Sequence, residues 1–240
     1  MKKILIIIFI ALFILAGGSW LFLHLYNKST ERDQAVTYYR LTPEEKALLR
    51  DGDIILRHGF GFVSDMIVEQ LDEQYDISHC AILCKDTNEL MIIHSVSSSI
   101  SPHDGVQSQD FDPFIRDSHY NSVIVVRYRS GNDSADNSGI SLRAREYLKK
   151  EIPFDHGFDL EDTSEFYCSE LLWKCILNEY HDDIFLDHRN ERKDHMRFDI
   201  FLDTSRFEIV LNHHLKKDKE SHSFQNLSAR NLRNFKPVSQ

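Results

Sequence analysis

The feature that most constrains this chain is an apolar run near its N-terminus. Residues 4–25 are almost all aliphatic or aromatic, with only a Gly-Gly-Ser triplet and one histidine among them, and two lysines precede the run. About 20 apolar residues are enough to cross a bilayer as a helix, and a positive start before an apolar run is typical of an export signal. Such a run does not suit a water-soluble domain, so we expect the fold to be built from the residues that follow it.

Two interpretations of this segment are open. Residues 1–27 can form an uncleaved signal anchor, or a signal peptide cut at the Ala-Gly-Gly triplet of residues 16–18. We favour the anchor, because the run continues past the usual length of a signal peptide and because Trp20 and Tyr26 suit a membrane interface. The lysines then stay in the cytoplasm. The domain that follows is therefore expected on the non-cytoplasmic side, periplasmic or extracellular, in the cell envelope.

Length and charge limit the remaining choices. The chain has 240 residues and a formal net charge of −10, which leaves room for one sizeable domain. An acidic chain lacks the basic surface that general nucleic-acid binding needs, so we expect no nucleic-acid partner. We divide the chain after the apolar segment into a linker with a short helix (28–50), one folded domain (51–215) and a polar tail (216–240).

Hydrophobic patterning predicts both strands and helices in this domain. Strands are expected at 53–57, 78–84, 90–96, 122–128 and 207–210, and helices at 43–50, 62–71, 140–150 and 168–176. The strands cluster before the last helix and do not alternate regularly with helices. This order favours an α+β fold with a mainly antiparallel sheet.

Other local signals mark helix starts and connections. Thr42 is expected to cap a helix that has Pro43 at its first position, and Asp162 and Glu165 could provide a capping end just before residue 168. Residues 27–36 are interpreted as a polar linker. Residues 97–119 are polar and contain two prolines, so we predict a long connection there.

The helix predicted at 168–176 carries a cysteine in its first turn. Its apolar residues recur at the spacing of an amphipathic helix, with Cys168 on the apolar stripe. The N-terminus of a helix favours a thiolate over a thiol, so Cys168 is a candidate nucleophile. The alternative is a small core residue, which is a common place for a free cysteine.

The four cysteines do not suggest a disulfide framework. Cys80 and Cys84 lie on one predicted strand, and Cys168 and Cys175 lie two turns apart on one helix, so neither pair is placed to bond. The CxxC-like pairs of a zinc site built from four thiolates are also missing. We therefore expect buried or reactive thiols.

Two histidines are candidates for the base that cysteine catalysis needs. His79 begins one predicted strand and His94 lies near the end of the next, so antiparallel pairing puts both at the same end of the hairpin. Taken singly, each is more simply a polar residue at a strand end. The chain has 13 histidines, which leaves a metal site as a weaker alternative, although no HExxH pattern is present.

Three motifs in this order resemble a known family. They are DGDII at 51–55, SHCAI at 78–82 and YCSELL at 167–172. Together they resemble the circularly permuted, NlpC-type, papain-like cysteine hydrolases, most closely the YiiX-like amidase and peptidase branch and more distantly lecithin retinol acyltransferase. The resemblance covers roughly residues 50 to 180. It implies a permuted papain-like fold in which the sheet packs against the nucleophile helix.

The resemblance also implies roles for particular residues. Cys168 would be the nucleophile and His79 the general base and acid. His94 would be the third member, at a position where close YiiX-like members usually carry Glu and the acyltransferase relatives carry His. Cys80, which follows His79, is interpreted as a core residue. The backbone N–H of Cys168 would help to stabilise an oxyanion.

A substrate-binding wall is expected just before the nucleophile. Residues 154–159 resemble an aromatic and Asp-containing segment of the family, and we assign Asp155 and Phe158, together with Tyr167, to substrate binding. The alternative for residues 154–159 is an exposed acidic loop.

These observations predict an exported, membrane-anchored cysteine hydrolase that cleaves an amide bond through an acyl-enzyme. No cofactor is expected, and the partner would be a peptide-, amide- or lipid-type substrate at the cell envelope. Two alternatives are acyl transfer between lipids, including thioesterase-like chemistry, and a non-catalytic envelope binding domain.

Overall fold

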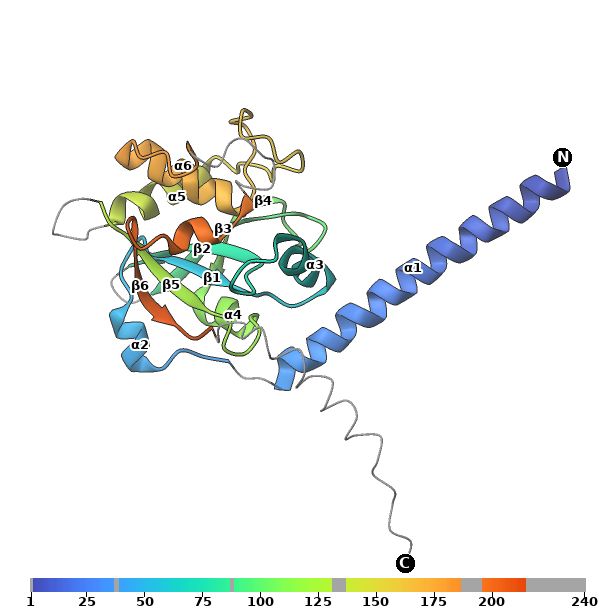
Figure 1. The fold of residues 1–240 in the computed structure, drawn as a ribbon, viewed down its shortest axis with the longest axis horizontal. Coiled ribbons are helices and arrows are strands. Elements are labelled where there is room, and N and C mark those ends of the chain that lie inside the picture. The colour runs from blue at the N-terminus through green and yellow to red at the C-terminus, as the bar shows by residue number, and fades with distance from the viewer. Residues whose placement is uncertain (1, 37–38, 87–88, 131–136, 187–195, 215–240) are drawn as a thin grey trace, which may run out of the picture.

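The domain is built around one antiparallel sheet with helices on both faces, and a long helix projects away from it (Figure 1). The computed structural model describes residues 2–36, 39–86, 89–130, 137–186 and 196–214. The predicted tail, residues 216–240, lies outside the described residues.

Six strands form the sheet in the order β4-β3-β2-β1-β5-β6. They are β1 (Ile54–Arg57), β2 (His79–Lys85), β3 (Leu90–Val96), β4 (Gly105–Asp110), β5 (Ile124–Tyr128) and β6 (Phe207–Asn212). Every neighbouring pair is antiparallel. The five predicted strands are confirmed, and so is the mixed helix and antiparallel sheet class.

The helices are α1 (Lys2–Val36), α2 (Pro43–Leu48), α3 (Phe62–Leu71), α4 (Phe111–Arg116), α5 (Ser138–Lys149) and α6 (Cys168–Tyr180), with a 3-10 turn, η3 (Asp199–Leu202). The predicted cap of α2 is present. The Thr42 side chain accepts the N–H of Glu45, and the Glu45 carboxylate accepts the N–H of Thr42. This reciprocal pair satisfies two backbone donors at the helix start.

Strand alternation sends successive side chains to opposite faces of the sheet. Ile54, Leu56, Cys80 and Ile82 face the layer formed by α5 and α6, in the larger core cluster. Ile55 and its neighbours face α4 and the segment around α2, in a second cluster. The sheet is thus buried on both sides, which explains why its central strands are almost continuously apolar.

The predicted long connection at 97–119 is wrong in part, because it contains β4 and α4. β4 reads Gly-Val-Gln-Ser-Gln-Asp and lies at the edge of the sheet, beside β3 alone, so few apolar residues are needed to form it. Pro113 lies in the first turn of α4. The N–H groups of the first turn have no acceptor within the helix, so a proline there costs no helical hydrogen bond and does not break the helix.

The predicted polar linker at 27–36 is also corrected, because α1 continues to Val36. A helix that is already nucleated gains one hydrogen bond for each added residue, and this segment contains good helix formers. α1 also contacts the domain: Phe62 of α3 packs edge-to-face on Tyr26, and the Tyr26 hydroxyl donates to Asp65 at 2.7 Å.

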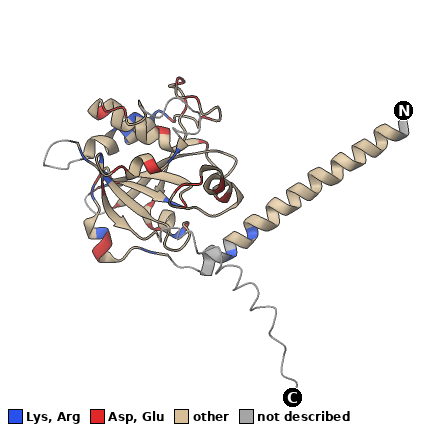
Figure 2. Cartoon of the chain, viewed as in Figure 1, with Lys and Arg blue, Asp and Glu red and all other residues tan. Residues whose placement is uncertain are grey.

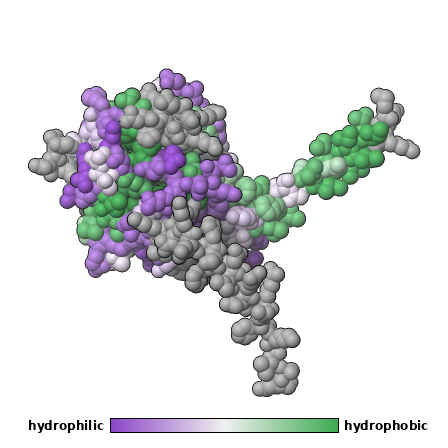
Figure 3. Space-filling view, viewed as in Figure 1, coloured by the Kyte–Doolittle hydropathy of each residue, from purple (hydrophilic) through white to green (hydrophobic). Residues whose placement is uncertain are grey.

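The apolar part of α1 has the length and composition of a membrane span. The stretch Ile4–Thr30 has a mean hydropathy of 2.7 over its most apolar window, and none of it is buried against the domain. Figure 3 shows its hydrophobic surface extending away from the more polar domain, and Figure 2 shows that the charged residues coloured on α1 lie at the end nearest the domain. A signal sequence shares this composition.

The DGDII motif has a structural role. Asp53 is fully buried and accepts two hydrogen bonds from the Arg127 guanidinium, both at 2.8 Å, and one from the N–H of Arg50. Gly52 has φ +79°, and a Cβ there would lie 1.9 Å from the carbonyl oxygen of Asn137. The motif therefore joins β1 to β5 and to the chain after α2, away from the residues proposed for catalysis.

Candidate active site

The first turn of α6 presents Cys168. Tyr167 is the N-cap in an extended conformation, and its N–H donates to the carboxylate of Glu170 at 3.4 Å. Asp162 and Glu165 do not cap the helix as expected. Both lie too early in the chain, and Asp162 accepts hydrogen bonds inside its own loop. The helix therefore begins at Cys168, whose own N–H is among those that a helix start leaves without an intrahelical partner.

The sulfur of Cys168 is surrounded by hydrogen-bond donors. The thiol of Cys80 donates to it, and this contact is the largest cause that lowers the pKa of Cys168. Burial opposes the shift, while the backbone N–H groups of Cys80, Ser169 and Cys168 itself add to it. The result is a pKa below the ordinary value for cysteine, as expected for a thiolate at a helix N-terminus.

Cys80 is a core residue as expected, but it also contacts the candidate nucleophile. It is fully buried on β2, facing α6. Burial raises its pKa well above the ordinary value, and the hydrogen bond that it donates to Cys168 raises it further. Of the two sulfurs, Cys168 is therefore the one that ionises.

The two candidate histidines lie side by side at one end of the β2–β3 hairpin. Nε2 of His79 is 2.8 Å from Nδ1 of His94, with the rings edge-to-face. Both rings lie near Phe114 of α4. Nε2 of His79 is thus occupied by His94, which leaves its Nδ1 as the ring nitrogen available to a thiol.

Burial keeps this histidine pair neutral. Desolvation lowers the pKa of His94 to about 3 and that of His79 well below its ordinary value, and the nearby Arg57 guanidinium lowers both further. Arg57 lies 3.8 Å from the centre of the Phe114 ring and donates to two backbone carbonyls. Nε2 of His94 is buried and has no hydrogen-bond partner among the described residues.

Two contacts hold the start of α6 at the histidine end of the sheet. The Cys168 sulfur is hydrogen-bonded to Cys80, the residue next to His79. The Ser95 hydroxyl, next to His94, donates to the carbonyl oxygen of Phe166. Among the described residues no hydrogen bond joins Cys168 directly to His79. The three candidate residues therefore share one end of the sheet, with the thiol and the histidine pair in two hydrogen-bonded groups.

The residues assigned to substrate binding are placed differently from one another. Asp155 and Tyr167 are each only 2% exposed. The Asp155 carboxylate accepts the N–H groups of Gly157, Phe158 and Asp159 at 2.6–2.8 Å, so it orders its own loop. Phe158 is partly exposed and packs on the Tyr167 ring at 5.3 Å. Phe158 is thus the one of the three whose side chain solvent can reach.

Glu170 is a buried acid that was not among the predicted site residues. It is fully buried, and desolvation raises its pKa to about 8, although Lys174 lies 3.9 Å away. The sequence did carry a signal for it, since a glutamate three residues after a helix cap is the second half of a capping box. No comparable signal indicated that the Cys80 thiol would contact Cys168 or that Arg57 would lie near the two histidines.

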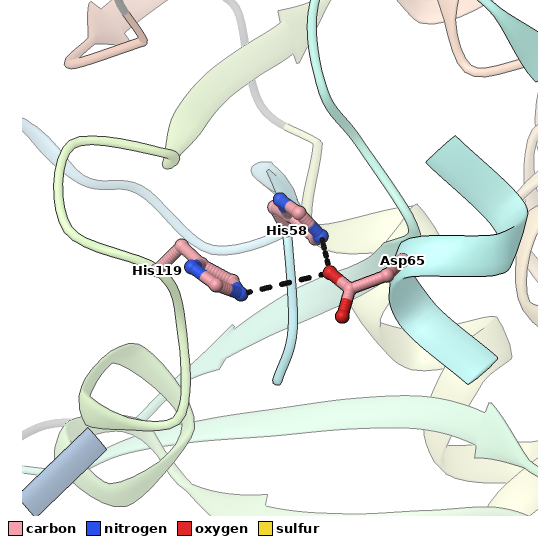
Figure 4. Close-up of side chains that lie close together, drawn as sticks. All are labelled: His58, Asp65 and His119. Carbon is pink, nitrogen blue, oxygen red and sulfur yellow. Dashed lines mark hydrogen bonds and ion pairs between the residues drawn. The ribbon is translucent and has the colours of Figure 1, made fainter. Parts of the chain in front are cut away.

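A second histidine cluster bears on the metal alternative. Oδ1 of Asp65 lies 3.0 Å from Nε2 of His58 and 3.9 Å from Nε2 of His119, and both nitrogens are directed at it (Figure 4). The two imidazoles are stacked, however, with centres 4.2 Å apart and planes inclined by 25°. An ion bound by both would have to lie in both ring planes, and planes this close to parallel do not meet near the nitrogens. The cluster does not have the convergent ligands of a metal site.

The fold and the site together define a class of protein, the permuted papain-like amidases. Residues 48–193 match the sequence profile described as permuted papain-like amidase enzyme, YaeF/YiiX, C92 family. Because this match covers more than half of the chain, the chain belongs to that family. It is therefore an enzyme of the amide hydrolase, cysteine peptidase type.

One solved structure that the fold resembles is metalloprotein yiiX from Escherichia coli O157:H7. The two chains are 20% identical, with a TM-score of 0.45, and the likeness covers 71% of this chain and 89% of that one. No curated protein matches this chain.

Proposed function

We propose that this amidase cleaves its amide through Cys168 as nucleophile, His79 as general base and acid, and His94 as the residue that orients His79. The observation that carries the proposal is the placement of Cys168 at the start of α6, where the Cys80 thiol of β2 and nearby backbone N–H groups lower its pKa. Thiolate character is what a nucleophilic cysteine requires. The hydrogen-bonded histidine pair lies at the same end of the sheet.

The reaction follows from these groups. The Cys168 thiol gives its proton to Nδ1 of His79 as the sulfur attacks the carbonyl carbon. The oxyanion that forms accepts the backbone N–H of Cys168. The C–N bond breaks as His79 returns the proton to the leaving amine, which leaves an acyl-enzyme. His79 then takes a proton from water, the hydroxide attacks the thioester, and the acid product departs as Cys168 is regenerated.

His94 controls which nitrogen of His79 carries the proton. When Nδ1 of His94 accepts a hydrogen bond from Nε2–H of His79, the Nδ1 lone pair of His79 is left for the thiol. Because burial keeps both rings neutral, the base is in its working form over the whole physiological pH range. The resting enzyme is therefore not a thiolate–imidazolium pair.

We further propose that the enzyme is exported and remains anchored by α1. The support is the apolar stretch Ile4–Thr30, whose most apolar window has no buried residue, and the interface-type residue Tyr26 where the helix meets α3. The substrate would then be a peptide-, amide- or lipid-linked acyl group at the cell envelope. Acyl transfer between lipids is the second candidate, favoured by the membrane anchor and by a histidine, His94, as third residue.

One experiment tests the function and separates the two candidates. The full-length protein in detergent is incubated with a panel of peptide amides, N-acyl amines and phospholipids, with and without a lysolipid acceptor. Intact mass is used to detect an acyl adduct on Cys168. Hydrolysis predicts amide cleavage and an acyl adduct in wild type and the loss of both in Cys168→Ala. The control Cys84→Ser changes a buried thiol on β2 and should retain both the cleavage and the adduct. Turnover that survives in Cys168→Ala would refute the nucleophile. Product that forms only with the acceptor would indicate acyl transfer.

A further inference from the structure

The four cysteines form two pairs between β2 and α6. Cys168 of the helix packs against the core cluster that contains Cys80 of the strand, and the Ser95 hydroxyl of β3 donates to the carbonyl oxygen of Phe166, two residues before Cys168. The Cys80 thiol donates to the Cys168 sulfur in this arrangement. Further along both elements, Cys84 lies close enough to Cys175 for their charges to interact. All four are free thiols. The strand and helix thus carry two cross-element pairs, one at the start of α6 and one inside the core.

The two pairs differ in the properties that govern oxidation. Cys84 and Cys175 are both fully buried, and desolvation raises the pKa of Cys84 to about 12 and that of Cys175 well above its ordinary value. Cys168 is partly exposed and has a lowered pKa. Peroxides react with accessible thiolates. Only the pair at the helix start therefore offers a target next to a second thiol.

We propose that Cys80 and Cys168 are a reversible oxidation site, in which Cys80 resolves oxidised Cys168 by forming a disulfide between β2 and α6. In the proposed hydrolysis Cys80 lowers the pKa of Cys168 but makes and breaks no bond. Its position beside the reactive sulfur is that of a resolving cysteine, which prevents oxidation beyond the reversible stage.

The chemistry balances with a peroxide as oxidant and a dithiol as reductant. The Cys168 thiolate attacks one peroxide oxygen, the O–O bond breaks, and Cys168 sulfenic acid and hydroxide form. The Cys80 sulfur, losing its proton, attacks the sulfenic sulfur, so that an S–S bond forms and water leaves. A dithiol then reduces the disulfide, and two thiols and an oxidised dithiol are recovered.

The two sulfurs must come closer together for the disulfide to form. Two sulfurs in a thiol–sulfur hydrogen bond must approach to about 2.05 Å to form the bond. Cys168 is the first residue of α6, so rotation of its side chain and a shift of the helix start can supply the approach. While the bond exists, Cys168 has no thiolate and hydrolysis stops.

The test uses the full-length protein in detergent with hydrogen peroxide at a small molar excess. Free thiols are blocked with N-ethylmaleimide, and non-reducing peptide mapping locates any crosslink. We expect a Cys80–Cys168 peptide in wild type and in the matched control Cys84→Ser, and its disappearance after dithiothreitol. In Cys80→Ser we expect dimedone to trap Cys168 sulfenic acid about 10-fold more than in wild type, because the resolving thiol is gone.

Two results would overturn the proposal. One is equal dimedone trapping in wild type and Cys80→Ser, and the other is a crosslink that joins Cys84 to Cys175 instead. The mapping does not depend on a substrate. A crosslink found in a protein without amidase activity therefore supports this inference and counts only against the proposed reaction. Amidase activity in a protein that forms no crosslink supports the proposed reaction and counts only against this inference.

Discussion

Nε2 of His79 lies 2.8 Å from Nδ1 of His94, so the two rings share one proton across the end of the β2–β3 hairpin. The strand register explains the contact. His79 opens β2 and His94 lies near the end of β3, and antiparallel pairing brings these ends together. Since burial keeps both rings neutral, the pair acts through its tautomer and not through its charge.

This pairing predicts the effect of removing His94. In His94→Ala the tautomer of His79 is no longer fixed, and we expect kcat for amide hydrolysis to fall about 100-fold or more. His94→Gln keeps an acceptor and should retain more activity than His94→Ala. Alkylation of Cys168 should stay within about 3-fold of wild type in both variants, because the donors to its sulfur are unchanged. Equal kcat values for His94→Ala and wild type would exclude the orienting role.

Cys80 is predicted to set the acidity of the nucleophile. The thiol of Cys80 stabilises the ionised sulfur of Cys168 and not the protonated form, so Cys80→Ala should raise the pKa of Cys168, by about one unit. The midpoint of the alkylation rate against pH, mapped to Cys168, measures the shift. Cys84→Ala, on the same strand and four residues after Cys80, is the matched control and should leave the midpoint unchanged. An unshifted midpoint in Cys80→Ala would mean that the backbone N–H groups stabilise the thiolate alone.

The buried ion pair between Asp53 and Arg127 is predicted to be essential for stability. Asp53→Ala leaves a guanidinium that is only 5% exposed without its carboxylate, and we expect the free energy of unfolding to drop by about 3–5 kcal/mol. The matched control is Asp112→Ala, which removes the exposed ion pair with Lys46 and should cost less than about 1 kcal/mol. Urea unfolding of both variants gives the comparison. Similar losses in the two variants would contradict the role of burial.

Glu170 is predicted to make stability depend on pH. Its pKa is about 8 in the folded protein and near the ordinary value of 4.5 when unfolded, so the folded state holds the proton more tightly. Its contribution is complete below the unfolded pKa and is lost as pH rises through the folded pKa. We expect the free energy of unfolding to fall between about pH 5 and pH 8, partly because of this group.

Glu170→Gln isolates that contribution. Glutamine cannot ionise, so the variant should show a shallower decline with rising pH than wild type in denaturant unfolding at several pH values. Glu69→Gln, on the exposed side of α3, is the control and should follow the wild-type curve. Parallel curves for Glu170→Gln and wild type would show that Glu170 is ionised in the folded protein throughout this range.

Local patterning was sufficient for most elements of the fold. The runs that became β1, β2, β3 and β5 are nearly all apolar because the sheet is buried on both faces, and the Thr-Pro start of α2 is a local signal. β4 was missed because an edge strand needs only one neighbour and few apolar residues. The extension of α1 to Val36 was missed because its residues are polar, and helix propagation does not depend on polarity.

The candidate site, like the fold, was predictable from the sequence only in part. The sequence by itself determined the family through its three motifs, the start of a helix at Cys168, and the meeting of His79 and His94 at one end of a hairpin, because each follows from local periodicity or antiparallel pairing. Only the tertiary structure decided that Cys80 donates to Cys168, that the Asp155 carboxylate accepts hydrogen bonds from its own loop, and that both histidines are neutral. These are properties of contact and desolvation between segments distant in the chain, and no local pattern encodes them.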